Sequence, residues 1–314
     1  MQYAMSTDLK ALDILQHRGG HPVMNCLDWS LQLLCNLMTN CSEAKEVCAS
    51  NNLVVPLNKL WPWCTSASQI RFHTLQMLCV YTNDCPKANQ SMHITIGLRS
   101  ILVEVLELIG REMGLVSRKH SLITLRCCLQ VLENVSSHVH CRAVILKSDI
   151  FTHLNKLHPA VTKRQGQWKE VEAMWENFTS TITRYPEGQL KVAEYMGVLC
   201  ALVHQANCLM LSVLRNCTFN PLNRPRLLGS AELLNLFSTI LTAETVLSDK
   251  LVVCGALWSL GANHHKSKLS LRTAGLTAKL MDFLHRLKYT SSGSYEDDRA
   301  IQIVTYVTKV ISIT

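Results

Sequence analysis

The chain has 314 residues and a net charge of +8, and 17% of its residues are charged. This length exceeds what one compact core usually supports, so we expect either two domains or an elongated array of small layers. Glycine (13) and proline (8) are scarce and aromatic residues make up 6%, a composition typical of helices rather than strands. The charge favours acidic partners, but the basic residues are too few and dispersed for a dedicated nucleic-acid-binding protein.

The 14 cysteines form no CxxC pair, and most fall inside apolar helical runs, as at Cys35, Cys79, Cys127, Cys200 and Cys254. We therefore expect buried free thiols in a reducing compartment. The sequence shows no signal peptide and no run of about 18 uninterrupted apolar residues, so it predicts a soluble intracellular protein without a membrane span. Its abrupt start and end indicate a fragment of a longer chain.

Apolar periodicity predicts helices along the whole chain. In the first half they are expected at residues 7–17, 27–39, 53–61, 67–82, 92–114 and 120–135. Pro62 should end the third of them, because proline cannot continue a helix.

In the second half, helices are expected at residues 167–184, 189–204, 207–219, 249–262 and 275–288, with a last one from residue 296. The YPEG sequence at 185–188 should form a loop, and a linker at 289–295 should precede the last helix.

A helix–turn–helix pattern recurs in this series. A late helix position is followed 16 residues later by the apolar residue that starts the next helix, in the pairs Leu37–Leu53, Val135–Phe151, Cys217–Leu233 and Leu260–Leu276. From Leu37, the corresponding positions Tyr81, Val135, Cys217 and Leu260 follow at intervals of 44, 54, 82 and 43 residues. Because 82 is about twice 41, a degenerate repeat is expected near 160–206. A period of roughly 41–44 residues is that of armadillo and HEAT repeats.

The clearest copy, residues 249–276, resembles the armadillo signature in its Gly255-Ala256-Leu257-Trp258 run, its Asn263, its Lys266 and Lys268, and its Ala274-Gly275-Leu276 restart. This resemblance implies an all-α fold, an armadillo/HEAT-type right-handed superhelical solenoid. It would run through 1–314 as a single array of about five to six repeats, with the third helix of each repeat lining a concave groove.

Segments 214–234 and 255–275 also resemble, more narrowly, the C-terminal armadillo region of the rotatin family of centriole and basal-body proteins. That resemblance implies a cytoplasmic, centrosomal or centriolar scaffold for assembling centrioles and ciliary basal bodies. Its partner would be a helical or extended segment of another centriolar protein.

The candidate partner-binding residues are polar and basic, namely Arg215, Asn220, Arg224, Arg226, Asn263, Lys266 and Lys268. The basic ones could recognise an acidic segment, although cations near helix C-termini also complement the helix dipole. A polar column runs through Asn40, Asn83, His138, Asn220 and Asn263. It could bind the backbone of an extended peptide, but the interpretation we favour is that it ends helices.

The sequence contains no recognised catalytic motif, so we expect no enzymatic activity and no cofactor. His138, His140 and Cys141 lie close together, as do His264 and His265, but neither group has a partner pair at metal-ligand spacing. The sequence therefore predicts no metal site.

The alternative function is an armadillo-type transport or adaptor receptor for signal peptides. Such receptors place a tryptophan four residues before a groove asparagine, whereas Ala262 follows Trp258 at that spacing. This departure counts against the alternative. Binding of RNA is disfavoured by the low density of basic residues.

Overall fold

The computed structural model describes residues 22–95, 97, 99–114, 119–157, 167–203, 208–290 and 295–312. The fold is all-α, and within these ranges no strand occurs. The elements of the first half are α2 (Pro22–Met38), α3 (Ser42–Ser50), α4 (Val54–Cys64), α5 (Ser68–Thr82), α6 (Pro86–Ser91), α7 (Ile101–Glu112), α8 (Lys119–Val135), α9 (Val139–Lys147) and the 3-10 helix η2 (Ile150–Leu157).

The second half continues with α10 (Gln167–Ile182), α11 (Pro186–Val192), η3 (Ala193–Tyr195), α12 (Met196–Val203), α13 (Cys208–Thr218), η4 (Pro221–Asn223), α14 (Arg224–Leu228), α15 (Ala231–Thr242), α16 (Leu247–Gly261), α17 (His265–Thr273), α18 (Leu276–Thr290) and α19 (Tyr295–Ser312). The chain divides into two compact units. Unit 1 comprises Met1–His153 and Arg164–Phe178, and unit 2 comprises Leu154–Lys163 and Thr179–Thr314.

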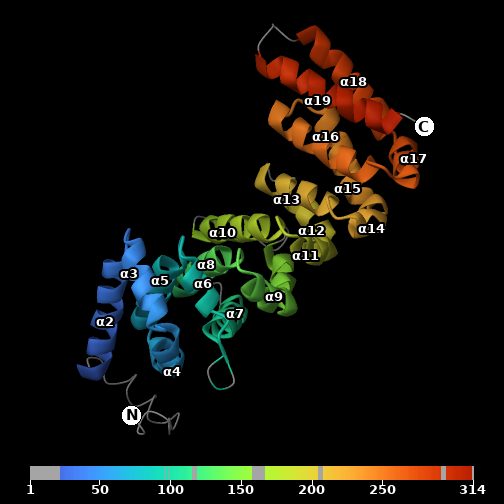
Figure 1. The fold of residues 1–314 in the computed structure, drawn as a ribbon. Coiled ribbons are helices and arrows are strands. Elements are labelled where there is room, and N and C mark those ends of the chain that lie inside the picture. Colours follow the sequence, from blue (N-terminus) through green and yellow to red (C-terminus); the bar gives the residue numbers. More distant parts are fainter. Residues whose placement is uncertain are drawn as a thin grey trace. The chain divides into compact units, whose positions relative to one another are not determined.

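In unit 1, each helix packs on the helix that lies three elements further along the chain. α2 contacts α5 and α5 contacts α8; α3 contacts α6 and α6 contacts α9; α4 contacts α7 (Figure 1). These contacts arrange the helices in three rows. The α2–α5–α8 row contains two helices of 17 residues, α2 and α8, and its side chains Met38, Tyr81 and Leu132 are fully buried.

Unit 2 has the same internal arrangement. α13 contacts α16 and α16 contacts α19, while α12 contacts α15, α15 contacts α18, and α14 contacts α17. The buried residues Leu214, Leu257 and Val304 lie on the α13–α16–α19 row. Each such buried aliphatic side chain contributes roughly 1.5–3 kcal/mol to folding, so these contacts hold the rows together.

Two of the asparagines expected to end helices do so through their backbone conformation. Asn40 follows α2 with φ of 55°, and Asn263 follows α16 with φ of 53°. Asparagine tolerates this left-handed conformation better than most residues do, so the helix-ending interpretation is confirmed at both positions. After α5 the left-handed residue is Asp84 (φ 52°), one position beyond the predicted Asn83.

Three predicted boundaries were wrong. Pro62 lies inside α4, which continues to Cys64; because only two helical residues follow it, the interruption is confined to the last turn. The helix expected at 92–114 begins only at Ile101, as α7, because the described residues between α6 and α7 are not helical and include Gly97 with φ of 72°. The expected loop at 185–188 contains the start of α11, because Pro186 occupies the first helical turn, where its missing N–H costs nothing.

Other expectations lie partly outside the described residues. The helix predicted at 7–17 is outside them, as are parts of the degenerate repeat at 160–206. The linker predicted at 289–295 is narrower than expected, because α18 reaches Thr290 and α19 begins at Tyr295.

The cysteines whose side chains the structure describes are free thiols. Cys35, Cys127, Cys200 and Cys254 are buried as predicted, whereas Cys79 is half-buried. Burial raises the pKa of Cys200 and Cys254 to about 12, so both stay protonated at neutral pH. In the part of the chain that the structure describes, no helix is long and apolar enough to cross a membrane.

Two helical glycines provide a matched test of this packing. A Cβ at Gly188 would lie 2.1 Å from the Ile182 carbonyl oxygen, whereas a Cβ at Gly197 would meet nothing within 4 Å. We expect Gly188→Ala to lower the free energy of unfolding by about 3 kcal/mol, because backbone has to move. Gly197→Ala should leave the free energy unchanged or raise it by up to ~1 kcal/mol. Chemical denaturation followed by circular dichroism measures both, and equal stabilities would show that α11 does not approach Ile182 this closely.

Candidate functional site

The surfaces formed by the α2–α5–α8 row and the α13–α16–α19 row are the candidate sites, because they correspond to the predicted groove. Near its C-terminal end, a helix of each row carries a polar side chain that reaches back along the chain. In unit 1, the Asn134 Nδ2 amide donates to the Cys79 carbonyl oxygen and to Thr82 Oγ1, both at 3.1 Å. This amide therefore joins α8 to α5.

Unit 2 has two equivalent links. Asn216 Nδ2 donates to Thr183 Oγ1 at 3.3 Å, and Ser259 Oγ donates to the Thr218 carbonyl oxygen at 2.7 Å. Side chains that a peptide-binding groove would use for a ligand backbone are thus bonded to the chain itself. Sequence analysis missed Asn134, Asn216 and Ser259, because it placed the polar column in the turns that follow these helices.

A hollow of about 290 Å³ lies at this surface in unit 1. Its lining comprises Thr39, Asn40, Lys45, Cys79, Val80, Asn83, Gln130 and Asn134. The side chain of Lys45 is buried, and its ammonium group donates to the Asn83 carbonyl oxygen at 2.9 Å. The hollow is therefore polar, and its buried cation already has a carbonyl partner.

The structure gives two of the predicted binding residues a different task. Asn220 is buried, and its Nδ2 donates to the Pro186 carbonyl oxygen at 3.1 Å while its Oδ1 accepts from the Leu222 N–H. Arg224 donates from Nη2 to the Ala262 carbonyl oxygen at 3.2 Å. Both side chains thus hold the turns of unit 2 in place, beside the exposed Asn263.

Arg215 lies on the α13–α16–α19 row itself. Its guanidinium carbon is 5.5 Å from the centre of the Phe219 ring, and its Cδ lies 3.5 Å from the position of a Cβ on Gly255. The arginine side chain therefore extends from α13 to α16 beside Gly255. Phe219 is 44% exposed and Arg215 is half-buried, so this pair places a partly exposed cation beside an exposed aromatic ring.

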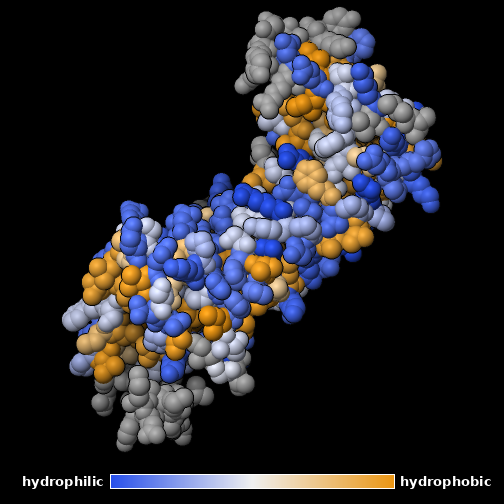
Figure 2. All heavy atoms as spheres, in the orientation of Figure 1, coloured by the Kyte–Doolittle hydropathy of each residue, from blue (hydrophilic) through white to orange (hydrophobic). Residues whose placement is uncertain are grey.

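The remaining predicted residues lie on the short helices rather than on this row. Arg226 is exposed on α14, and Lys266 is exposed on α17, while Lys268 is half-buried on α17. Figure 2 shows hydrophilic residues gathered over α17. Because α14 packs on α17, these cations form a basic edge beside the turn that Arg224 holds.

An aromatic pair on the α13–α16–α19 row was not predicted as a site. The rings of Trp258 on α16 and Tyr306 on α19 lie 5.9 Å apart, and the two residues are 36% and 57% exposed. Trp258 entered the sequence analysis through the armadillo signature and through the spacing that counts against a transport receptor. Tyr306 had no signal of its own, because its pairing depends on how α16 and α19 pack.

Two further surfaces are apolar. A cavity of about 620 Å³ lies between α7, α9 and η2, with Leu106, Val144 and Ile150 among its lining residues. Separately, Trp29, Leu33 and Leu37 are 57–67% exposed and are spaced four residues apart along α2. Figure 2 shows hydrophobic residues at the surface over α2 and α3.

Comparison with known proteins adds a distant relative. No protein-family model matches the chain. It is 24% identical to mouse rotatin over 291 residues and 24% identical to human rotatin over 293 residues. These matches cover 86% and 87% of this chain, and the chain spans about 13% of the length of either relative. The identity supports a weak rotatin-like relationship.

A solved structure supports the fold. The crystal structure of an engineered protein matches with a TM-score of 0.61 and 16% sequence identity, covering 96% of this chain and 71% of the other. At this identity the match concerns the arrangement of helices and says nothing of activity.

The link between Asn134 and α5 can be tested with a matched asparagine. Asn36 precedes Leu37 as Asn134 precedes Val135, but Asn36 is exposed on α2. We expect Asn134→Ala to lower the free energy of unfolding by about 1 kcal/mol, because the hydrogen bonds of its amide to α5 are lost. Asn36→Ala should change it by less than about 0.5 kcal/mol. Thermal and urea denaturation compare the two variants. Equal effects would show that the Asn134 side chain does not stabilise the packing of α8 on α5.

Proposed function

We propose that the chain is a non-enzymatic protein-binding scaffold with an armadillo/HEAT-type right-handed solenoid architecture. The packing of each helix on the one three elements later supports this architecture within each unit. The weak rotatin-like relationship supports a place in centriole, centrosome and ciliary basal-body assembly.

One observation carries the mode of binding. The amides of the row surfaces are bonded within the chain, whereas Arg215, Phe219, Trp258 and Tyr306 present side chains on the α13–α16–α19 row. An extended peptide needs free polar groups for its backbone, whereas a helix satisfies its own backbone and offers only side chains. The proposed partner is therefore an amphipathic helix of another centriolar protein. Its apolar residues would contact the rings of Phe219, Trp258 and Tyr306, and its acidic residues would pair with Arg215.

The alternative function, a transport or adaptor receptor that reads signal peptides, is less favoured. It needs a ladder of free asparagines along the groove, and Asn134, Asn216 and Asn220 bond to the chain itself. A receptor for basic signals also needs an acidic groove, in contrast to the net charge of +8.

Charge reversal at Arg215 and Arg226 tests the proposal. The tagged chain is expressed in ciliated cells to measure its recruitment to centrioles, and purified chain is titrated with candidate centriolar helices. We expect the double variant to bind at least ~10-fold more weakly, a loss of about 1.4 kcal/mol, because an acidic helix would meet two carboxylates instead of two cations. Trp258→Ala should weaken binding in the same assays by removing apolar contact area.

Lys59→Glu serves as the control for charge reversal at a single site, because Lys59 is exposed on α4, away from the row surface of unit 2. Melting temperatures of all variants show whether a loss of binding reflects unfolding. If the charge-reversal and tryptophan variants are recruited as well as the parent chain, the row surface of unit 2 has no part in recognition. If the parent chain itself is not recruited to centrioles, the centriolar assignment is wrong.

A further inference from the structure

Three histidine rings meet in unit 1 where the end of α6 approaches the start of α9. His93 lies in the turn after α6, His138 is the N-cap of α9, and His140 is in the first turn of α9. Their ring centroids are 5.4 Å (His93–His138), 5.1 Å (His93–His140) and 5.5 Å (His138–His140) apart. α6 and α9 are in contact, so the fold brings together residues that the sequence separates by more than 40 positions.

Two of these rings lack the hydrogen bonds that half-buried histidines normally make. The Nδ1 atoms of His93 and His138 each expose less than 1 Å² and have no hydrogen-bond partner. Elsewhere in the chain, His73 Nδ1 lies 2.6 Å from Asp28 Oδ1, and His264 Nδ1 lies 2.6 Å from Ser267 Oγ. Buried polar atoms without a partner are rare in native structures, so a pair of them side by side needs an explanation.

His138 and His264 both lie at the start of a helix, but their side chains make different hydrogen bonds. His264 is the N-cap of α17, and its ring accepts a hydrogen bond from the Ser267 N–H at 3.1 Å. His138 holds the same position before α9, yet its side chain makes no capping hydrogen bond. Its imidazole instead lies beside the rings of His93 and His140.

A thiol completes the group. Cys141 is fully buried on α9, and one potential ligand atom from each of His93, His138 and Cys141 lies within 4.8 Å of the others. Tetrahedral zinc, with Zn–N of about 2.0–2.1 Å and Zn–S of about 2.3 Å, places its ligand atoms roughly 3.3–3.7 Å apart. The three side chains therefore need to approach by only about 1 Å, within reach of small side-chain rotations because His93 lies in a turn.

The donor atoms of the three side chains are of the kind that zinc binds. The Cys141 thiol donates to the Asn89 carbonyl oxygen at 3.1 Å, and binding a metal would release that proton. Two imidazoles and one cysteine sulfur form a set of the type that zinc prefers.

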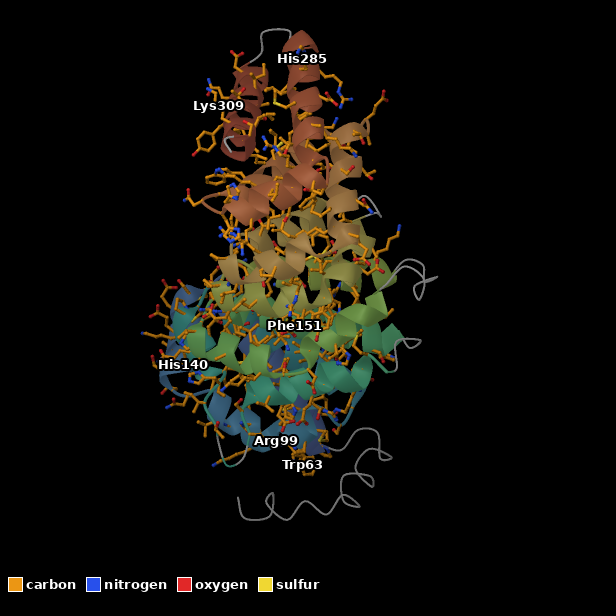
Figure 3. The ribbon with its side chains drawn as sticks, turned by 90° about the vertical axis from the view of Figure 1, so that its right-hand side faces the viewer. Trp63, Arg99, His140, Phe151, His285 and Lys309 are labelled. Atoms are coloured by element: carbon orange, nitrogen blue, oxygen red, sulfur yellow. The ribbon has the colours of Figure 1, made fainter. Side chains whose placement is uncertain are left out.

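We propose that His93, His138 and Cys141 bind a divalent transition-metal ion of the zinc type, and that this ion joins the end of α6 to the start of α9. The fourth ligand would be water or the exposed His140, whose ring lies 5.1 Å from that of His93 and which Figure 3 shows at the surface of the molecule. The sequence alone predicted no metal site because His138 and Cys141 lacked a partner, and His93 supplies it.

Cobalt provides the direct test, because it reports its ligands by absorption. The reduced chain, freed of metal by a chelator, is titrated with Co²⁺ and then with Zn²⁺. We expect one equivalent of Co²⁺ to give the visible absorption of a tetrahedral site together with a near-ultraviolet sulfur-to-cobalt charge-transfer band. Zn²⁺ should abolish both. An octahedral spectrum, or no saturable spectrum, would overturn the proposal.

Variants assign the ligands. Cys141→Ser should lose the charge-transfer band, and His93→Ala or His138→Ala should weaken binding at least ~10-fold. His265→Ala is the matched control, because His265 is exposed on α17, and it should bind as the parent does. A charge-transfer band that persists in Cys141→Ser would place the metal on another cysteine and overturn the assignment.

A stability measurement guards against variants that fold poorly. Zn²⁺ should raise the melting temperature of the parent and of His265→Ala, because the metal binds the folded chain. It should not raise that of His93→Ala, whose substitution lies in a turn and leaves both helices intact. An equal rise in all three proteins would overturn the proposal.

Discussion

The carbonyl groups at the end of each row helix need partners from outside that helix, and the rest of the structure depends on how they are supplied. Side chains of the short helices and turns provide many of them, in the bonds Lys45–Asn83, Asn89–Asn134, Gln189–Thr183, Asn223–Cys217 and Arg224–Ala262. Three of these bonds reach the next row helix along the chain, and two return to the helix just completed. The same interaction therefore ends a helix and sets the position of the next one.

This constraint decides what the row surfaces can recognise. Asn134 and Asn216 already link neighbouring helices, so a peptide bound through these amides would have to replace the inter-helix hydrogen bonds. The surface that remains consists of rings, a guanidinium group and small residues such as Gly255. Recognition through such a surface depends on side-chain packing and charge, which a partner helix can match without giving up its own backbone hydrogen bonds.

The sequence predicted the helical class and most helix positions because apolar periodicity reports directly on burial. It also predicted the turns at Asn40 and Asn263, where the side chain itself favours the left-handed backbone. It failed where a residue's role depends on a partner distant in the sequence. Arg224 looked like a surface cation, and its bond to Ala262 depends on packing that no local pattern contains. His93 likewise gave no signal until α6 and α9 were placed together.

The residue just before each short helix shows how one structural position can serve different chemistry. At this position Asn220 and His264 cap their own helices, whereas Cys85 is buried and makes no capping bond. The backbone there is extended in every case, so the fold does not depend on one type of side chain. His138 is therefore free to face His93 and Cys141, and a metal-binding group can arise there without disturbing the helix that follows. This position recurs before each short helix and accepts different residue types. Such turns are therefore places where similar repeats can differ in function.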